Sequence, residues 1–245
     1  MVDRSDVERF RKANAALSQS ARDDLETFFK SLNLSKPVAA RNALLEFVPI
    51  LTEEHGAAAA TLAADWYEEL RSASGAVGRF SATAAGSVPD ASVQAKVRYL
   101  AGHLWTPEPA AMLGPLSTSV DKYVKQPSRN TMAYNATRER VKLARVPSGS
   151  KTCAFCLTLA SRDVVYLSER SAALRSDSEK YHGHCDCQPV RIKTIDDYPD
   201  GYDPGSMYEM YKDARNEAGS GDVKDIAASM RRMFPDSLTD GVHTH

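Results

Sequence analysis

The stretch VERFRKANAALSQSARDDLETFFKSL, residues 7–32, indicates the fold class of this chain. Its apolar side chains recur at intervals of three, four and seven residues, which is the spacing of one face of an α-helix. The residues of this stripe are Val7, Phe10, Leu17, Ala21, Leu25, Phe28 and Leu32. A stripe of this kind is buried against other helices, so the sequence predicts a helical bundle at the N-terminal end.

The helical spacing continues to about residue 147. Ser35-Lys36-Pro37 has the composition of a helix start, with proline in the first turn. The apolar face of the helix that follows comprises Leu44, Val48, Leu51, Ala58, Leu62, Trp66 and Leu70. Pro49 is expected to kink this helix, because proline lacks an amide donor and clashes with the preceding turn.

The boundaries of the later helices in this region are predicted from the proline, glycine and capping residues that interrupt the helical spacing. Residues 75–90 are rich in small residues and glycine, so we expect a loop there, with Asp90 capping the next helix. Further boundaries are expected at Thr106-Pro107, Gly114-Pro115, Pro127-Ser128 and Val146-Pro147.

The composition excludes some function classes. The 245 residues are 42% hydrophobic and carry a formal net charge of -1, which gives no global attraction to DNA or to acidic membranes. No apolar run approaches the roughly 18 residues that span a bilayer, and MVDRSDVERF lacks the apolar core of a secretory signal. We therefore expect synthesis in a reducing cytoplasm and no membrane partner, and clustered cysteines there favour metal or redox chemistry.

The character of the chain changes after residue 147. We expect a mostly α fold in which an N-terminal helical bundle is followed by a small zinc-stapled α+β module and C-terminal helices. The predicted domains are a helical domain at 1–147, a Cys/His metal-binding module at 148–198, and helices with a tail at 199–245. Residues 164–167 and 188–193 are expected to pair as strands. Ser206 and Asp222 are expected to cap the last helices, and the residues after Pro235 to form a mobile tail.

All four cysteines lie between Lys151 and Val190, as C-x-x-C followed by H-x-H-C-x-C. A C-x-x-C turn presents two thiolates to one ion, and zinc completes a tetrahedron with two further donors. The candidate ligands are Cys153, Cys156, His182, Cys185 and Cys187, with His184 as a further histidine. We favour Cys153, Cys156, His182 and one of the cysteines of the C-x-C pair. A disulfide between the halves, a redox-active pair and free thiols remain alternatives.

The role expected for zinc is structural. Residues 151–190 include few apolar side chains, and small segments of this kind usually need a disulfide or a structural metal to stabilise their fold. A catalytic zinc is not favoured, because the H-x-E of nucleobase deaminases is absent from the sequence. A zinc-dependent nuclease remains the alternative enzyme reading, although no convincing ββα unit accompanies the cysteines.

Two segments carry a family resemblance: RVPSGSKTCAFCLTLASRDVVY, residues 145–166, and YHGHCDCQPV, residues 181–190. They resemble the minor capsid, or head morphogenesis, proteins of tailed phages, in the Mu-F-like group and its actinobacteriophage type. In this resemblance the histidine of the family corresponds to His182 and its C-x-C to Cys185 and Cys187. The resemblance implies a non-enzymatic protein inside the virion head, bound to the portal or the inner major-capsid surface. It would act in head assembly, genome packaging or delivery.

A basic segment precedes the cysteines. Residues 129–145 are expected to form one helix that carries Arg129, Arg138, Arg140, Lys142 and Arg145. Such a helix could bind packaged DNA weakly through phosphates, without reading sequence. A solvated helix face is the alternative, and a DNA-binding module is the third function class that the sequence leaves open.

Overall fold

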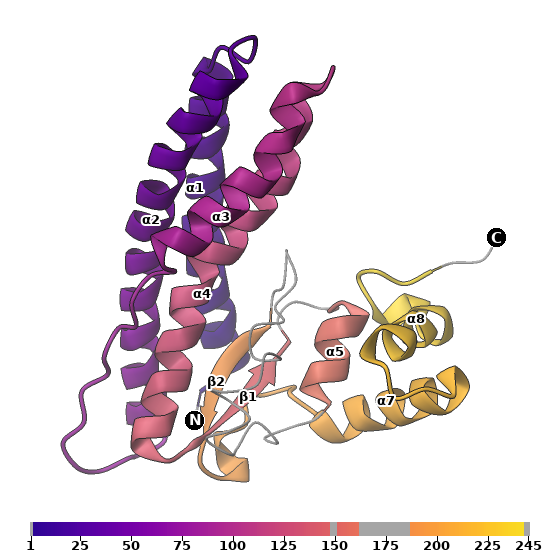
Figure 1. The fold of residues 1–245 in the computed structure, drawn as a ribbon. Coiled ribbons are helices and arrows are strands. Elements are labelled where there is room, and N and C mark those ends of the chain that lie inside the picture. The colour runs from indigo at the N-terminus through magenta and orange to yellow at the C-terminus, as the bar shows by residue number, and fades with distance from the viewer. Residues whose placement is uncertain (1, 148–150, 162–186, 243–245) are drawn as a thin grey trace.

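The computed structural model describes residues 2–147, 151–161 and 187–242, and this part of the chain is mostly helical. Figure 1 shows an elongated arm built from α1, α2, α3 and α4, a two-stranded sheet at its base, and a smaller lobe of α5, α7 and α8 beside it. We refer to these parts as the arm, the sheet and the lobe. No helix of the described part combines the length and apolar composition that crossing a membrane requires.

The arm begins with two long antiparallel helices. Helix α1 spans Arg4–Ser31 and starts at a capping box between Asp3 and Asp6, and α2 spans Pro37–Ala73 with proline in its first turn. The predicted stripe of α1 is confirmed in part. Val7, Phe10, Ala21 and Leu25 are buried, whereas Leu17, Phe28 and Leu32 are partly buried against the core. Asn14, Ser18 and Phe29, which were not predicted, are buried as well. Phe28 lies at the edge of this stripe, where its ring stacks on Phe47 with centroids 3.8 Å apart.

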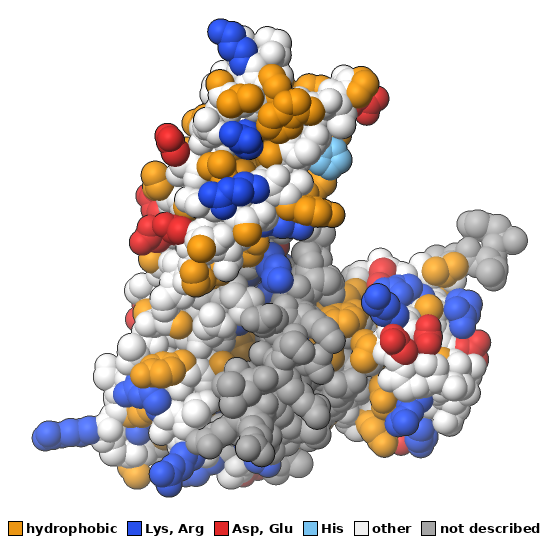
Figure 2. Space-filling model, in the orientation of Figure 1, with side chains coloured by type: hydrophobic (Ala, Val, Ile, Leu, Met, Phe, Trp, Pro, Cys, Tyr) orange, Lys and Arg blue, Asp and Glu red, His pale blue; other side chains and the backbone are white. Residues whose placement is uncertain are grey.

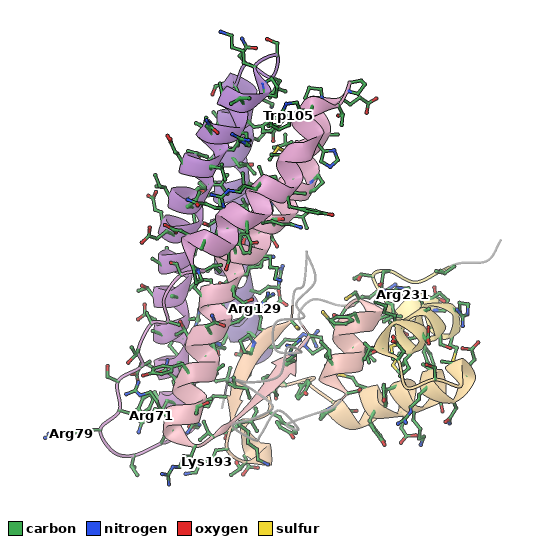
Figure 3. The ribbon with its side chains drawn as sticks, viewed as in Figure 1. Arg71, Arg79, Trp105, Arg129, Lys193 and Arg231 are labelled. Carbon is green, nitrogen blue, oxygen red and sulfur yellow. The ribbon has the colours of Figure 1, made fainter. Side chains whose placement is uncertain are left out.

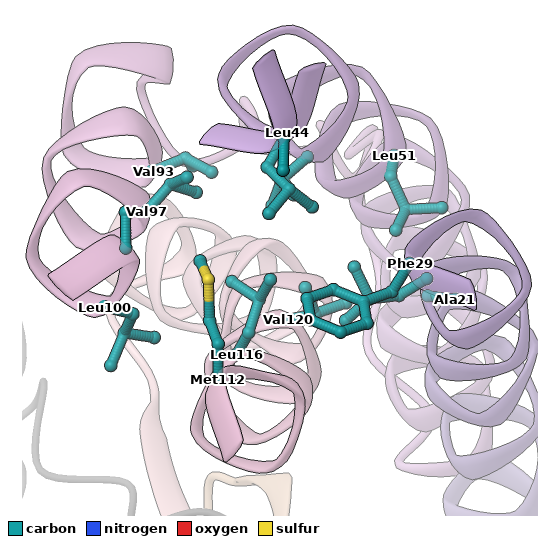
Figure 4. Packing of buried hydrophobic residues seen from close by; sticks show 14 of the residues in the cluster. Ala21, Phe29, Leu44, Leu51, Val93, Val97, Leu100, Met112, Leu116 and Val120 are labelled. Carbon is teal, nitrogen blue, oxygen red and sulfur yellow. The ribbon is translucent and has the colours of Figure 1, made fainter. Parts of the chain in front are cut away.

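The upper half of the arm has an apolar core of its own. Helix α3 spans Asp90–Leu100, the 3-10 helices η1 and η2 span Ala101–Trp105 and Pro109–Met112, and α4 spans Leu113–Glu139. Figure 4 shows how side chains from α1, α2, α3, η2 and α4 meet in this core. Its buried residues include Ala21, Phe29, Leu44, Leu51, Val93, Val97, Leu100, Met112, Leu116 and Val120.

Several predicted helix boundaries are wrong. Helix α4 continues through both Gly114-Pro115 and Pro127. Pro115 falls in the first turn, where the missing amide would have had no partner within the helix. Pro127 is buried beside Gly56, where an added Cβ would lie 3.1 Å from the proline ring, so packing offsets the lost hydrogen bond. Asp90 is the first residue of α3 and makes no capping bond.

Two further predictions concern α2 and the loop after it. The predicted loop at 75–90 is confirmed up to Pro89. Helix α2 continues across the buried Pro49, and the hydroxyl of Thr52 donates to the carbonyls of Val48 and Pro49, each at 3.0 Å.

The sheet pairs the end of the arm with a distant segment. Strand β1, Lys142–Val146, runs antiparallel to β2, Gln188–Ile192, with Ala144 opposite Val190. The strand predicted at 188–193 is confirmed, whereas residues 164–167, its predicted partner, lie outside the described residues. The predicted basic helix at 129–145 is wrong beyond Glu139, because Arg140 adopts a left-handed backbone with φ 58° that ends α4.

The lobe packs three helices around an apolar cluster. These are α5 (Ala154–Ala160), α7 (Pro204–Ala218) and α8 (Val223–Met233). Short 3-10 turns follow β2 at Ile195–Asp197 and α8 at Pro235–Ser237. Asp222 caps α8 as expected, accepting from the amide of Lys224 at 2.7 Å. Helix α7 is capped by Asp203 and not by Ser206, because the Asp203 carboxylate accepts from the Ser206 amide at 3.0 Å.

Candidate functional site

Three of the cysteines lie together where the lobe meets the sheet. Cys153 is the N-cap of α5, and its Sγ accepts a hydrogen bond from the Cys156 amide at 3.4 Å. Cys187 immediately precedes β2. Cys156 and Cys187 are both 1% exposed and form one packed cluster with the half-buried Cys153. We call these three residues the thiol cluster.

Two separate parts of the structure, the sheet and the lobe, position the cysteines of the thiol cluster. The sheet fixes Cys187, since Gln188 pairs with Val146. The lobe fixes α5, because Ala154 and Leu157 pack in the same cluster as Ile226 and Met230 of α8. Cysteines 34 residues apart in sequence are thereby brought side by side.

The chain after Pro235 holds the start of α5. The amide of Ala154 donates to the Asp240 carboxylate at 2.8 Å, and that carboxylate also accepts from Arg231 at 2.7 Å. The amide of Thr239 donates to the Thr152 carbonyl at 3.0 Å, beside a bridge between Thr152 and Leu238. The prediction of a mobile tail is therefore wrong as far as Asp240. Figure 3 shows Arg231 on the upper side of the lobe.

The chemistry of the thiol cluster suits a soft metal ion. Thiolates are the donors that zinc prefers in structural sites. In the described part of the chain, however, no three or more histidine, cysteine or acidic side chains are arranged to hold a metal ion. The three cysteines thus share a packed cluster without the spacing of a finished ligand set. His182, His184 and Cys185, the other candidates, lie outside the described residues.

The basic residues do not share one surface. Arg129 and Arg145 are buried, at 8% and 7% exposure, and Lys142 and Arg145 lie on β1 and not on a helix. Arg138 is exposed but holds the loop before α3, donating to the Ser81 carbonyl at 3.0 Å and to the Thr83 hydroxyl at 2.9 Å. Figure 3 shows Arg129 on the side of α4 that faces the sheet. The continuous basic helix face expected from the sequence is therefore absent from the described residues.

A buried ionic network joins the sheet to the arm, and sequence analysis missed it. Arg191 of β2, with a side chain 1% exposed, donates twice to the Glu139 carboxylate, at 2.7 Å each. The Tyr67 hydroxyl donates to the same carboxylate at 2.7 Å, and Arg71 Nε donates at 3.2 Å. The network therefore ties α2, the end of α4 and β2 to one carboxylate.

The network shifts the pKa values of its members. Burial, reinforced by the neighbouring Glu139, raises the pKa of Tyr67 well above its usual range. Burial alone would raise the pKa of Glu139, but the hydrogen bonds from Arg191 and Tyr67 outweigh it and hold that pKa below its ordinary value. Glu139 is therefore a carboxylate at neutral pH, and Tyr67 is a neutral donor.

A second buried carboxylate, Asp121, links α1 to α4. Asp121 of α4 has a side chain 2% exposed, and it accepts from Arg22 of α1 at 2.5 Å and from Lys125 at 3.0 Å. The signal for such pairs in sequence is an acidic residue within an apolar helix face, as Asp121 is between Val120 and Val124.

Comparison with known proteins places this architecture in a family. A family model described as VG15 protein matches residues 1–214, which takes in the arm, the sheet and most of α7. The Gene 15 protein of Mycobacterium phage D29 is 29% identical over 100 residues, a match covering 31% of this chain and 36% of the phage protein. The match thus spans about a third of that relative's length. No solved structure matches this chain with comparable significance.

These matches bear on the resemblance seen in the sequence. The expectation of a phage protein is confirmed, whereas the Mu-F-like assignment and the role in the head stay predictions. Because the family model covers most of the chain, this protein belongs to the VG15 protein family.

Proposed function

We propose that the protein is a structural minor head protein of a tailed phage, inside the capsid or associated with the portal. It would be made in the host cytoplasm and would act in head assembly, genome packaging or delivery, as an interaction protein and not as an enzyme. The observation that carries this proposal is the VG15 family match over residues 1–214 together with the phage relative.

The shape of the molecule is suited to bridging. An α-helix rises 1.5 Å per residue, so the 37 residues of α2 extend about 55 Å. The long arm ends far from the lobe, as Figure 1 shows, so the two ends can contact different components of a particle. An assembly protein uses separated surfaces in this way, whereas an enzyme concentrates its polar groups around one cleft.

The particle itself provides the test of the proposed function. Peptides of this chain are expected in mass spectra of purified mature particles, and a phage that lacks the gene is expected to yield fewer DNA-filled heads. Supplying the gene in trans should restore both. Absence of the protein from mature particles and from head intermediates would contradict a structural role.

We propose further that the thiol cluster contributes to a structural zinc site. Cys153, Cys156 and Cys187 would each supply a thiolate, and His182 would supply the fourth donor. We choose Cys187 for the third thiolate because it is buried beside Cys156. Cys185 lies outside the described residues, and spacing alone would allow either cysteine to serve, since residues two apart on an extended segment point to the same side. When bound, zinc supplies cross-linking without redox or acid–base chemistry.

Metal analysis tests this site. Protein purified without chelator is expected to contain one zinc per chain. Cys153→Ser, Cys156→Ser and Cys187→Ser should each lose it, and Cys185→Ser is the matched control that should keep it. A zinc content near zero, with the four thiols paired as disulfides, would give the site to the disulfide alternative.

A further inference from the structure

The end of the arm carries exposed aromatic and aliphatic side chains. Trp105, the last residue of η1, is 52% exposed, and Tyr99 in the last turn of α3 is 78% exposed. Val38, in the first turn of α2, is 54% exposed. Figure 3 shows Trp105 near the upper end of the arm, and Figure 2 shows hydrophobic side chains gathered there beside Lys and Arg.

Cations accompany these side chains. The Arg41 guanidinium lies over the Trp105 ring, 5.9 Å from its centroid, and links that ring to α2 one turn after Val38. Lys96 lies 5.0 Å from the centroid of the Tyr99 ring. We call Val38, Arg41, Lys96, Tyr99 and Trp105 the arm tip. A cation held against an aromatic ring keeps its charge close to the apolar surface.

The charge of this end of the arm is not balanced. Between them, residues 33–42 and 96–112 contain Lys36, Arg41, Lys96 and Arg98 against Glu108 as the acidic residue. Some cations elsewhere in the described residues are paired with carboxylates, as Arg22 is with Asp121 and Arg191 with Glu139. Within the described residues, neither cation of the arm tip contacts a carboxylate. Arg41 donates to the neutral Asn42 at 2.9 Å, and Arg98 donates to the neutral Gln94 at 3.2 Å.

We propose that the arm tip docks on an acidic protein surface of the phage particle, with Trp105 and Tyr99 entering an apolar depression that is rimmed by carboxylates. This inference rests on the proposed function and names the surface through which it operates. Trp, Tyr and Arg are the residue types that dominate binding energy when they are buried at the centre of an interface. The unpaired cations would be matched by the carboxylates of the partner, which sets orientation and suppresses wrong partners.

Two other occupants fit the arm tip less well. A second copy in a two-fold contact would bring the same patch against itself, and Arg41 and Lys96 would then face like charges. DNA binding draws its affinity from many phosphate contacts along a basic surface. Here Arg41 and Lys96 each lie against an exposed aromatic ring, and Val38 adds exposed apolar surface. An acidic protein surface satisfies both the apolar and the charged side chains.

Complementation in trans tests the proposal. A phage lacking the gene is grown in cells that supply wild-type protein, the double variant Trp105→Ser/Tyr99→Ser, or the charge variant Arg41→Glu/Lys96→Glu. Tyr134→Ser is the matched control, because Tyr134 is 51% exposed and also carries a cation, Arg138, 5.6 Å from its ring centroid, lower on the arm. The measurement is the number of copies per purified particle, by quantitative mass spectrometry.

The expected result is at least a tenfold loss of both arm-tip variants from particles, with wild type and Tyr134→Ser retained. Retention of the arm-tip variants at wild-type level overturns the proposal and leaves the proposed function standing. Absence of wild-type protein from particles overturns the proposed function and, with it, this docking site. If wild-type protein is retained in DNA-filled heads but not in DNA-free heads, DNA is the occupant of the arm tip. A dimer of the purified protein that the arm-tip variants abolish identifies a second copy, and either finding also overturns the proposal.

The fold of the variants is checked with the same side chain. The chain has two tryptophans, and Trp66 is 3% exposed. Iodide should therefore quench mainly the emission of Trp105, and Trp105→Ser should remove the quenchable emission while that of Trp66 and the helical circular dichroism stay unchanged. A variant that meets this criterion and still fails to enter particles has lost the contact and not the fold.

Discussion

Replacing Glu139 by glutamine is expected to destabilise the protein by about 3 kcal/mol, because removing one member of a buried ion pair leaves the other charge uncompensated. The Arg191 side chain is 1% exposed and makes both of its carboxylate bonds to Glu139, whose own side chain is 13% exposed. Glutamine retains the shape and one acceptor oxygen, so the change isolates the charge. For a chain of this size the loss corresponds to a fall in Tm of about 9 °C.

The assay is urea unfolding followed by circular dichroism at pH 7. Glu217→Gln is the matched control, because Glu217 pairs with Arg232 on the lobe with side chains 44% and 53% exposed, and such exposed pairs contribute between about 0 and 1 kcal/mol. The double variant Glu139→Gln/Arg191→Met should recover part of the loss, since it removes the stranded charge. Equal, small effects of Glu139→Gln and Glu217→Gln would refute the reasoning.

The pH dependence follows from the direction of the shift at Glu139. Its pKa in the folded protein lies below the ordinary value of 4.5, so its ionic contribution is fully present above that value and is lost as the pH falls through the folded pKa. The difference in stability between wild type and Glu139→Gln should therefore be constant from pH 7 to about pH 5.5 and should close at lower pH. A difference that persisted unchanged at pH 3 would contradict the assignment of the effect to charge.

Three further outcomes are expected. Asp240→Ala should cost about 1–2 kcal/mol, as a lost helix cap does, and should expose the α5 region to protease, whereas Asp236→Ala, the control on the same segment, should change little. Tyr67→Phe should cost about 1 kcal/mol by removing one buried hydrogen bond, measured by the same urea titration. Any DNA affinity should fall with salt, and Arg140→Ala/Lys142→Ala, which changes the two basic residues of the segment that are exposed and hold no loop, should lower the salt slope by about 2; an unchanged slope would exclude this segment as the DNA contact.

The helical arm was predictable because its signal is repeated. The stripe from Val7 to Leu32 recurs over many turns, so spacing predicts the apolar side of α1, although it misses the buried polar residues Asn14 and Ser18. Individual prolines were misleading as signals of a helix end, because whether a proline ends a helix depends on its position in the helix and on its packing. Pro115 lies in a first turn, and Pro127 packs against Gly56 from α2, a contact between residues 71 apart in sequence. Local composition contains neither fact.

The sheet shows the other limit of sequence reasoning. Strand β2 was predicted at 188–193, but its pairing with β1 was not, because that pairing depends on the left-handed Arg140 that ends α4 and frees residues 142–146. A non-glycine residue with positive φ gives little signal in sequence. The ionic network was missed for the same reason, since Glu139, Arg191 and Tyr67 come from three distant segments.

The candidate site was predicted in part. The cysteines were expected to gather, and the structure places Cys153, Cys156 and Cys187 together. The sequence could not choose between Cys185 and Cys187, because both suit the same extended segment. Pairing of Gln188 with Val146 fixes the position of Cys187 beside it, whereas Cys185 lies outside the described residues, so Cys187 as the ligand stays a proposal.

The placement of the thiol cluster changes what a metal there would stabilise. Cys187 is anchored to the arm through β2 and the Arg191–Glu139 pair, whereas Cys153 and Cys156 are anchored to the lobe through α5. A cross-link among them would therefore join the lobe to the arm and close a loop of about 34 residues, a constraint worth roughly 3–4 kcal/mol by chain entropy.

The sequence alone predicts that chelation unfolds only the segment around the cysteines. The structure predicts instead that chelation loosens α5, α7 and α8 from the sheet while the arm's core, which lacks any cysteine, stays folded. Hydrogen exchange with and without chelator distinguishes the two: faster exchange throughout α7 and α8 supports the joint between arm and lobe, and unchanged exchange there contradicts it.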